Sequence, residues 1–377
     1  MKIVLSGVET INRGAELMLY AILQEIERKY PNADVYIDSR ANIQGLGYIK
    51  TALKLHYWQF SDFFRKTHSD KILNNFHLPT SLFENLFVEA DYVFDGSGFC
   101  FSDQCGLWGR SASWWEYFLK RQYAHGAKII FLPQAFGPLE TPPVKDAIKV
   151  LNKYSCIIMP RERVSYDYLK KSELVDMKKV KLFPDFTSLV EGTFPAKYAH
   201  LRNGICIIPN KKMIAKGCIS FEKYISLMED IIEVGKNSGR VVYILNHEGK
   251  GDEELAYQCS DKFNSKIEVV SGLNALDTKG LISSAYVVIT SRFHGLASAL
   301  NSCVPSFATS WSHKYSELFR DYLLEDCVLP LDNNETALAK IRELLVDETN
   351  KQIREKLKAR VPEIKKQTHD MWNVIWE

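Results

Sequence analysis

The chain has 377 residues, of which 46% are hydrophobic and 25% are charged, and its formal net charge is +2. This length favours two domains over one, and this composition is that of a globular protein with sizeable cores. No apolar run reaches the roughly 18–20 residues that a membrane span requires. The net charge argues neither for nor against nucleic acid, but the sequence has no basic arm, and no nucleic-acid partner is expected.

The N-terminus and the cysteines favour a cytoplasmic location. Residues 1–7 enter a strand-and-turn pattern too soon for a signal peptide. The eight cysteines are scattered and include no C-x-x-C pair, which argues against a metal knuckle. We therefore expect a protein of a reducing compartment, with no metal.

The first half of the chain alternates short apolar strands with helical patterns. A strand at 2–5 and a polar, glycine-bearing turn at 6–14 precede a predicted helix at 15–29 and a strand at 33–37. Further strands are predicted at 90–94, 128–132, 156–159 and 179–183. This start is typical of a doubly wound sheet, although the first loop has neither the dinucleotide fingerprint nor the Walker lysine.

Residues 51–68 mix aromatic and basic side chains. As a helix they would carry Leu53, Tyr57, Phe60 and Phe64 on one side. The simpler interpretation is a helix packed on the core. The alternative is an interfacial helix in peripheral contact with the inner face of a membrane or with a lipid-linked substrate.

Several predicted strands end in polar or glycine-bearing turns, such as Asp-Gly-Ser-Gly at 95–98 and the turn that begins at Arg161. Such a turn is either a plain tight turn or a place where the backbone approaches a ligand closely. The aromatic residues that follow are expected in the core or in the wall of a sugar site: Trp108, Trp114, Trp115, Tyr117 and Phe118.

A second β/α series follows a stretch without periodicity at 191–203, where we place a linker. Its elements are predicted at 204–208, 221–234, 241–245, 253–263, 267–270, 274–283, 315–322, 335–345 and from 351 onward. The sequence thus predicts an α/β protein with two Rossmann-like domains facing a cleft, as in GT-B folds. We predict an N-terminal domain at 1–195 on the acceptor side, a C-terminal domain at 203–355 on the donor side, and a C-terminal helix at 356–377 that returns to the N-terminal domain.

The stretch from Ser284 to Ser306 carries the strongest functional signal. An apolar run at 285–290 predicts a buried strand, and Ser291 is a natural N-cap for a helix at 292–301. Arg292 and His294 then lie in a first helical turn just past a strand's carboxyl end, where ligands bind in open α/β sheets. Helix N–H groups together with an arginine fork favour a carboxylate or phosphate there, whereas the plainer alternative is a capping or surface role.

With these elements in order, the chain resembles the polysaccharide pyruvyl transferase family over about residues 1–325. The resemblance is carried by Asn12-Arg13-Gly14-Ala15-Glu16, Asp95-Gly96-Ser97-Gly98, Gly137-Pro138, Arg161-Glu162 with Ser165, Pro184-Asp185, Asn210, and Ser291-Arg292-Phe293-His294-Gly295 with Val304-Pro305. The last motif is the most specific. The chain departs from the family in its first loop, where Ala15 stands in place of a frequent Asp and leaves the role of that acid open.

The resemblance implies an enzyme that moves a pyruvyl group from phosphoenolpyruvate to a sugar, often as a cyclic ketal, with no cofactor beyond this donor. It implies a catalytic pair, His294 and Arg292, in which His294 gives a proton to the enol carbon, and it implies that Arg292 and Arg161 hold the donor's anions. Other substrate contacts are expected from Arg161, Asn210, Lys212, Asn12, Gly14, Gly96, Ser97, Gly98 and Ser291. Because a helix N-terminus disfavours imidazolium, we expect protonation of His294 to be coupled to donor binding.

Two other functions fit the same fold class. One is a nucleotide-sugar glycosyltransferase, with Glu248 and Asp252 in place for a base and ribose pocket. The other is a non-catalytic glycan-binding relative, suggested by Ala15 and opposed by the intact Arg292/His294 pair. For the acceptor, the family implies a sugar of a capsule or exopolysaccharide unit, lipid-linked at the cytoplasmic face of a bacterial membrane.

Overall fold

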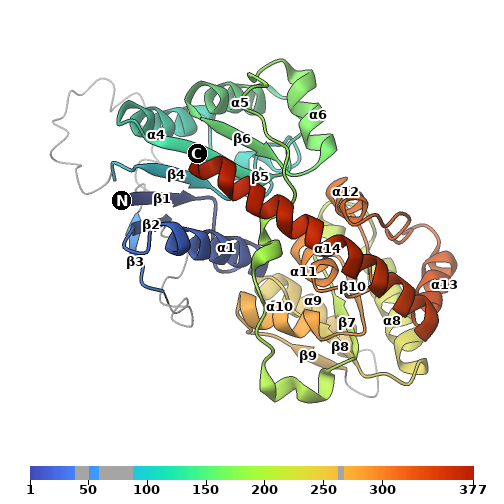
Figure 1. Cartoon of the computed structure of the whole chain (residues 1–377). Helices are drawn as coiled ribbons and strands as arrows, with labels where there is room; N and C mark the ends of the chain where they lie inside the picture. The colour runs from blue at the N-terminus through green and yellow to red at the C-terminus, as the bar shows by residue number, and fades with distance from the viewer. Residues whose placement is uncertain (39–50, 59–87, 262–266) are drawn as a thin grey trace. The chain divides into compact units, whose positions relative to one another are not determined.

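A computed structural model describes residues 1–38, 51–58, 88–261 and 267–377 of the chain (Figure 1). The chain divides into two compact units. The first contains residues 1–10, 18–186 and 371–377, and the second contains residues 11–17 and 187–370. Each unit has its own parallel sheet with helices packed against it, so the predicted α/β class with two Rossmann-like sheets is confirmed.

The first sheet has the strand order β3-β2-β1-β4-β5-β6. Its strands are β1 (Lys2–Ser6), β2 (Asp34–Asp38), β3 (Lys54–Trp58), β4 (Tyr92–Asp95), β5 (Lys128–Gln134) and β6 (Ile157–Pro160). Helices α1 (Arg13–Lys29), α4 (Ala112–Ala124) and α5 (Pro142–Tyr154) lie between these strands, and α6 (Arg163–Ser172) follows β6. A 3-10 turn, η3 (Gly106–Gly109), precedes α4. The order reverses between β1 and β4, which is the switch point where ligands bind in such sheets.

Both faces of the first sheet are covered, which explains why its strands are apolar throughout. Val93 of β4 packs in one cluster with Trp115 and Phe118 of α4. The next residue, Phe94, faces the other way and contacts the rings of Trp372 and Trp376 near the C-terminus, at 6.3 and 5.6 Å between ring centroids.

The second sheet has the strand order β11-β10-β7-β8-β9. Its strands are β7 (Ile205–Ile208), β8 (Val242–Leu245), β9 (Glu268–Val270), β10 (Val287–Thr290) and β11 (Ser306–Ala308). The helices are α7 (Lys212–Ala215), α8 (Phe221–Asn237), α9 (Gly249–Asp261), α10 (Ala275–Ser283), α11 (Phe293–Asn301), α12 (Lys314–Asp321), α13 (Asn334–Leu344) and α14 (Asp347–Trp376). Two 3-10 turns, η4 (Phe186–Leu189) and η5 (Ala196–Leu201), precede β7.

Alternate residues of the second sheet belong to two different cores. Ile205 and Ile207 of β7 pack in a cluster that includes residues of α8, α9 and α13, whereas Cys206 and Ile208 pack in a cluster that includes residues of α10 and α11. This two-sided burial is what turns a strand into a continuous apolar run in the sequence.

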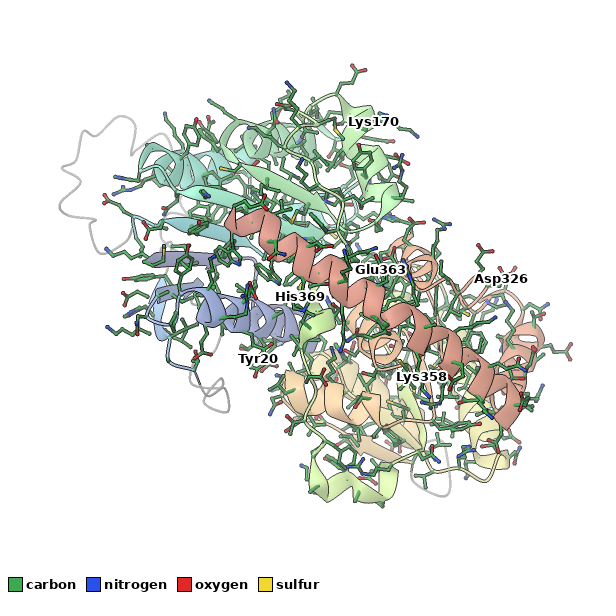
Figure 2. All side chains as sticks on the ribbon, in the orientation of Figure 1. Tyr20, Lys170, Asp326, Lys358, Glu363 and His369 are labelled. Carbon is green, nitrogen blue, oxygen red and sulfur yellow. The ribbon has the colours of Figure 1, made fainter. Side chains whose placement is uncertain are left out.

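Helix α14 is amphipathic and 30 residues long, with Pro362 inside it. Leu357, Val361 and Ile364 are buried in a cluster with residues of α11 and α12, within the second unit. Residues 371–377 belong to the first unit, where Trp376 Nε1 donates to Glu25 Oε1 at 2.8 Å. The polar side chains of Lys358, Glu363 and His369, labelled in Figure 2, are exposed along the same helix.

Two predicted elements were wrong. The helix expected at 51–68 is strand β3 at Lys54–Trp58, which pairs in parallel with β2 along its whole length. Polar and apolar residues alternate at the start of this strand, and His56 pairs with Asp34 of β2 at 3.0 Å, so cross-strand contacts decide the conformation. Residues 59–68 lie outside the described part. The strand expected at 179–183 is reduced to a single bridge between Ile158 and Val180.

Candidate active site

The predicted site residues of the second unit gather at the carboxyl edge of its sheet. Strand β7 lies between β8 and β10, and the strand order reverses between β7 and β10. The turns after these three strands carry Asn210, the segment 246–252, and the segment 291–294. This is the switch point at which open α/β sheets bind ligands.

Asn210 and Ser291 hold the turns of this edge together. The Asn210 amide donates to the Ser291 carbonyl at 2.8 Å, and its Oδ1 accepts the Lys212 N–H at 2.9 Å. The Ser291 hydroxyl shares hydrogen bonds with Tyr224 at 2.7 Å and Thr309 at 2.6 Å. Both side chains are buried, and these bonds orient the backbone from which Arg292 begins.

Arg292, not Ser291, occupies the N-cap position of α11, which begins at Phe293. The predicted cap differs because the Ser291 hydroxyl is engaged by Tyr224 and Thr309, while the Thr290 hydroxyl accepts the Arg292 N–H at 2.9 Å. His294 therefore lies in the first turn of α11, as predicted.

The Arg292 side chain is buried between two carboxylates. Its Nε donates to Asp252 Oδ2 at 2.7 Å, Nη2 also contacts Asp252, and Nη1 contacts Glu248. Burial lowers the pKa of Arg292 to about 10, so it stays charged at neutral pH. Burial raises the pKa of Asp252 to about 7, against the opposing effect of the Lys211 N–H that donates to it.

The first loop of the chain joins this edge within the second unit. Asn12 caps α1 through its Oδ1, which accepts the Gly14 N–H at 2.8 Å, and its backbone forms an antiparallel bridge with Glu248. The Arg13 N–H donates to the His247 carbonyl at 3.2 Å. Ala15 follows Gly14 in this loop, and the buried Glu16 carboxylate pairs with Arg13.

Gly14 packs directly against the His294 imidazole. A Cβ placed on Gly14 would lie 2.3 Å from His294 Nδ1 and 2.6 Å from its Cγ, far inside van der Waals contact. The absence of a side chain at position 14 is therefore what allows the first loop to seat the imidazole of α11.

His247 is a member of the site that the sequence analysis missed. It is buried, and its Nδ1 has no hydrogen-bond partner in the described part of the chain. Burial, with Arg292, His294 and Arg13 nearby, holds its pKa well below the ordinary histidine value, so it is neutral. Its position just after β8 was the available signal, because the turns after β7 and β10 also supply site residues.

The predicted residues of the first unit lie at the carboxyl edge of the first sheet. Ser97 bonds to Asp95 through both its N–H and its hydroxyl, and Gln134 at the end of β5 donates to the same carboxylate at 3.3 Å. Gly96 and Gly98 flank Ser97 in this turn. Arg161, after β6, is buried beside Asp185 at 3.8 Å, and its N–H donates to the Gln134 carbonyl.

The family was established by comparison with known proteins. A sequence model of the polysaccharide pyruvyl transferase family matches residues 12–313, well over half of the chain. The chain belongs to this family. The match includes both the first loop and the Arg292/His294 motif, and the predicted resemblance is confirmed. The comparison with curated proteins gave no match to this chain.

Solved structures share the fold of this family member at low sequence identity. The Neisseria meningitidis UDP-GlcNAc 2-epimerase bound to UDP-GlcNAc gives a TM-score of 0.63 at 9% identity, with 100% of each chain covered. The S. aureus MnaA–UDP structure gives 0.63 at 12%, covering 100% of this chain and 96% of the other. Anabaena HepE, in complex with UDP and glucose, gives 0.62 at 11%, covering 99% of each. The predicted GT-B-type fold is confirmed.

Two further observations concern the part of the chain that the structure describes. None of its helices has the length and apolar character needed to cross a lipid bilayer. Within residues 1–38, 51–58, 88–261 and 267–377, no three His, Cys, Asp or Glu side chains are grouped as metal ligands.

Proposed function

We propose that this family member transfers a pyruvyl group from phosphoenolpyruvate to a sugar of a polysaccharide or lipid-linked glycan, as a ketal. The observation that carries the proposal is the position of a buried, charged Arg292 and a first-turn His294, two residues apart, at the switch point of the second sheet. An arginine fork suits a carboxylate or phosphate, and an imidazole can donate a proton beside it.

The reaction needs one proton donor and a cationic site that binds the anionic groups of phosphoenolpyruvate. His294 gives a proton to the methylene carbon of phosphoenolpyruvate, a sugar hydroxyl oxygen bonds to the central carbon, and the proton of that hydroxyl returns to the imidazole. The oxygen of a second hydroxyl then replaces phosphate at that carbon, and phosphate leaves with its bridging oxygen and the proton of the second hydroxyl, so that the cyclic ketal results. Arg292 stabilises the charge on the donor throughout.

The first loop supports the proposed proton transfer. Gly14 fixes one side of the imidazole, and the first turn of α11 disfavours an imidazolium unless an anion is present. A bound dianion therefore favours protonation of His294, which couples the proton to the donor.

For the acceptor we propose the carboxyl edge of the first sheet. Trp108, in the η3 turn that follows β4, is 43% exposed, and both Leu107 and Trp108 adopt positive φ values. Strained backbone that presents an aromatic ring to solvent is a signal of a functional surface, and a flat ring suits the apolar face of a sugar.

Calorimetry with phosphoenolpyruvate, followed by phosphate release against a panel of galactosides and N-acetylhexosamines, tests the proposal. We expect saturable donor binding and acceptor-dependent phosphate release. UDP- and GDP-sugars form the second arm. Binding of a nucleotide sugar without binding of phosphoenolpyruvate would replace the proposal with a glycosyltransferase. Release of phosphate that no acceptor stimulates would contradict the transfer step.

A further inference from the structure

The two carboxylates that hold Arg292 differ in how firmly they are fixed. Asp252 is 3% exposed, contacts both Nε and Nη2 of Arg292, and accepts the Lys211 N–H at 3.0 Å with its other oxygen. The Glu248 side chain is 24% exposed and contacts Nη1 alone. Asp252 is therefore the permanent partner of Arg292, whereas the place of the Glu248 carboxylate is open to exchange with a solute.

The Glu248 carboxylate lies between two cations. One oxygen contacts Arg292, and the other is 4.0 Å from Lys212 Nζ. Lys212 follows β7 and Arg292 follows β10, so the two cations come from the two strands that flank the switch point. A carboxylate bridging a guanidinium and an ammonium has the charge and size that a small anionic ligand would present there.

We infer that Arg292 and Lys212 form an anion seat which Glu248 occupies in the ligand-free chain, and that a carboxylate or phosphate of the donor displaces Glu248. The inference rests on the proposed function only for the identity of that donor. Displacement exchanges one anion for another, so the cations are never left unpaired, and the observed affinity is lowered by the cost of releasing Glu248.

The local backbone suits a side-chain exchange without a loop movement. The Glu248 backbone is bridged to Asn12, and α9 begins at the next residue. The carboxylate can therefore leave Arg292 by rotation of its own side chain. Because Glu248 competes for the seat, ligands with two negative charges are favoured over singly charged anions such as chloride.

The test compares Glu248→Gln with Glu254→Gln in the full chain. Glu254 is a matched control, since its side chain is 69% exposed on α9, the helix that follows Glu248, and it pairs with Lys211 and not with Arg292. Calorimetry measures the Kd of phosphoenolpyruvate and, separately, of inorganic phosphate. For Glu248→Gln we expect both Kd values to fall about tenfold, and for Glu254→Gln to stay within about twofold. Glu248→Ala, expected to act in the same direction, replaces the Gln variant if that one fails to fold.

The outcomes separate the seat from the proposed donor. If Glu248→Gln binds inorganic phosphate more tightly but neither protein binds phosphoenolpyruvate, the seat stands and the proposed donor is wrong. If the wild-type chain turns over phosphoenolpyruvate and Glu248→Gln binds neither anion more tightly, the seat is wrong and the function stands. Absence of phosphate and phosphoenolpyruvate binding to Glu248→Gln overturns the seat, as does equal tightening in the Glu254→Gln control.

Discussion

The carboxyl edges of the two sheets have the same topology and opposite chemistry. Each contains a point where the strand order reverses, between β1 and β4 in the first sheet and between β7 and β10 in the second. The second edge gathers Arg292, Asp252 and Glu248 in one ion-paired group, with His247 and His294 nearby. At the first edge, the reversal point carries a network of hydroxyl and amide groups around Asp95.

The two edges differ in the groups that surround their buried carboxylates, Asp95 and Asp252. Burial raises the pKa of Asp95, against the opposing effects of the Ser97 and Gln134 hydrogen bonds and of the Arg110 charge nearby. Asp252 instead faces a guanidinium. One topology thus provides a reversal point where hydroxyl and amide groups bond to an acid and a reversal point where an arginine is paired with two carboxylates, so the residues and not the fold decide the chemistry. Four experiments test this contrast.

The largest effect is expected from His294→Asn. Loss of the proton donor should lower kcat for phosphate release by roughly 100- to 10,000-fold. The Kd of phosphoenolpyruvate should rise by a much smaller factor, because Arg292 is intact and only the coupling to the imidazolium is lost. Steady-state kinetics with calorimetry measures both. The control is His200→Ala, whose side chain is exposed in the same unit and pairs with Glu268. An unchanged kcat in the His294 variant would remove this residue from the chemistry.

A smaller loss is expected from Gly14→Ala. The added Cβ would displace the His294 ring, and a misplacement of about 1 Å can lower the rate by as much as roughly 100-fold. Gly251→Ala is the matched control, since Gly251 is also helical and its Cβ would meet only the flexible Lys211 side chain, at 3.2 Å. The measurement is kcat in the two variants. Equal kcat values would show that the His294 imidazole keeps its working position beside a Cβ at residue 14.

Trp108→Ala probes the first edge. We expect the KM for the acceptor to rise about threefold to tenfold, the range of an aromatic contact, with the Kd of phosphoenolpyruvate unchanged. Tyr123→Ala removes another exposed ring of the same unit, 55% exposed, and should leave both constants unchanged. If the Kd of phosphoenolpyruvate changes and the KM for the acceptor does not, Trp108 has no role in acceptor binding.

The smallest effect concerns stability at low pH. The folded-state pKa of His247 lies below its unfolded value, so below about pH 6.5 the unfolded chain binds more protons and stability falls as pH falls. Protonation of this one residue changes the free energy of unfolding by at most about 1.4 kcal/mol per pH unit. In urea unfolding between pH 5 and 7, His247→Gln should lose stability less steeply with acid than the wild type. Parallel pH profiles would show that His247 is not buried in its neutral form.

Sequence patterns were reliable where burial on both faces or helical periodicity dominated. The strands β7, β8 and β10 were predicted within a few residues, because a strand covered on both sides is an uninterrupted apolar run. Strand β3 was mistaken for a helix because its partner β2, and not its own composition, provides its cross-strand contacts. Helices α4 and α5 were not predicted at all, although α5 is strongly amphipathic and begins with two prolines after Thr141.

At the site, the sequence was enough to place an arginine and a histidine two residues apart just after a buried strand, at the edge where open α/β sheets bind ligands. The groups that surround them could be read only from the folded chain. The turn after β8 supplies His247 and Glu248, and the start of α9 supplies Asp252. Gly14 comes from the first loop of the chain. Contacts between residues hundreds of positions apart leave no periodicity in a sequence, because they depend on which strand ends the fold brings to one edge.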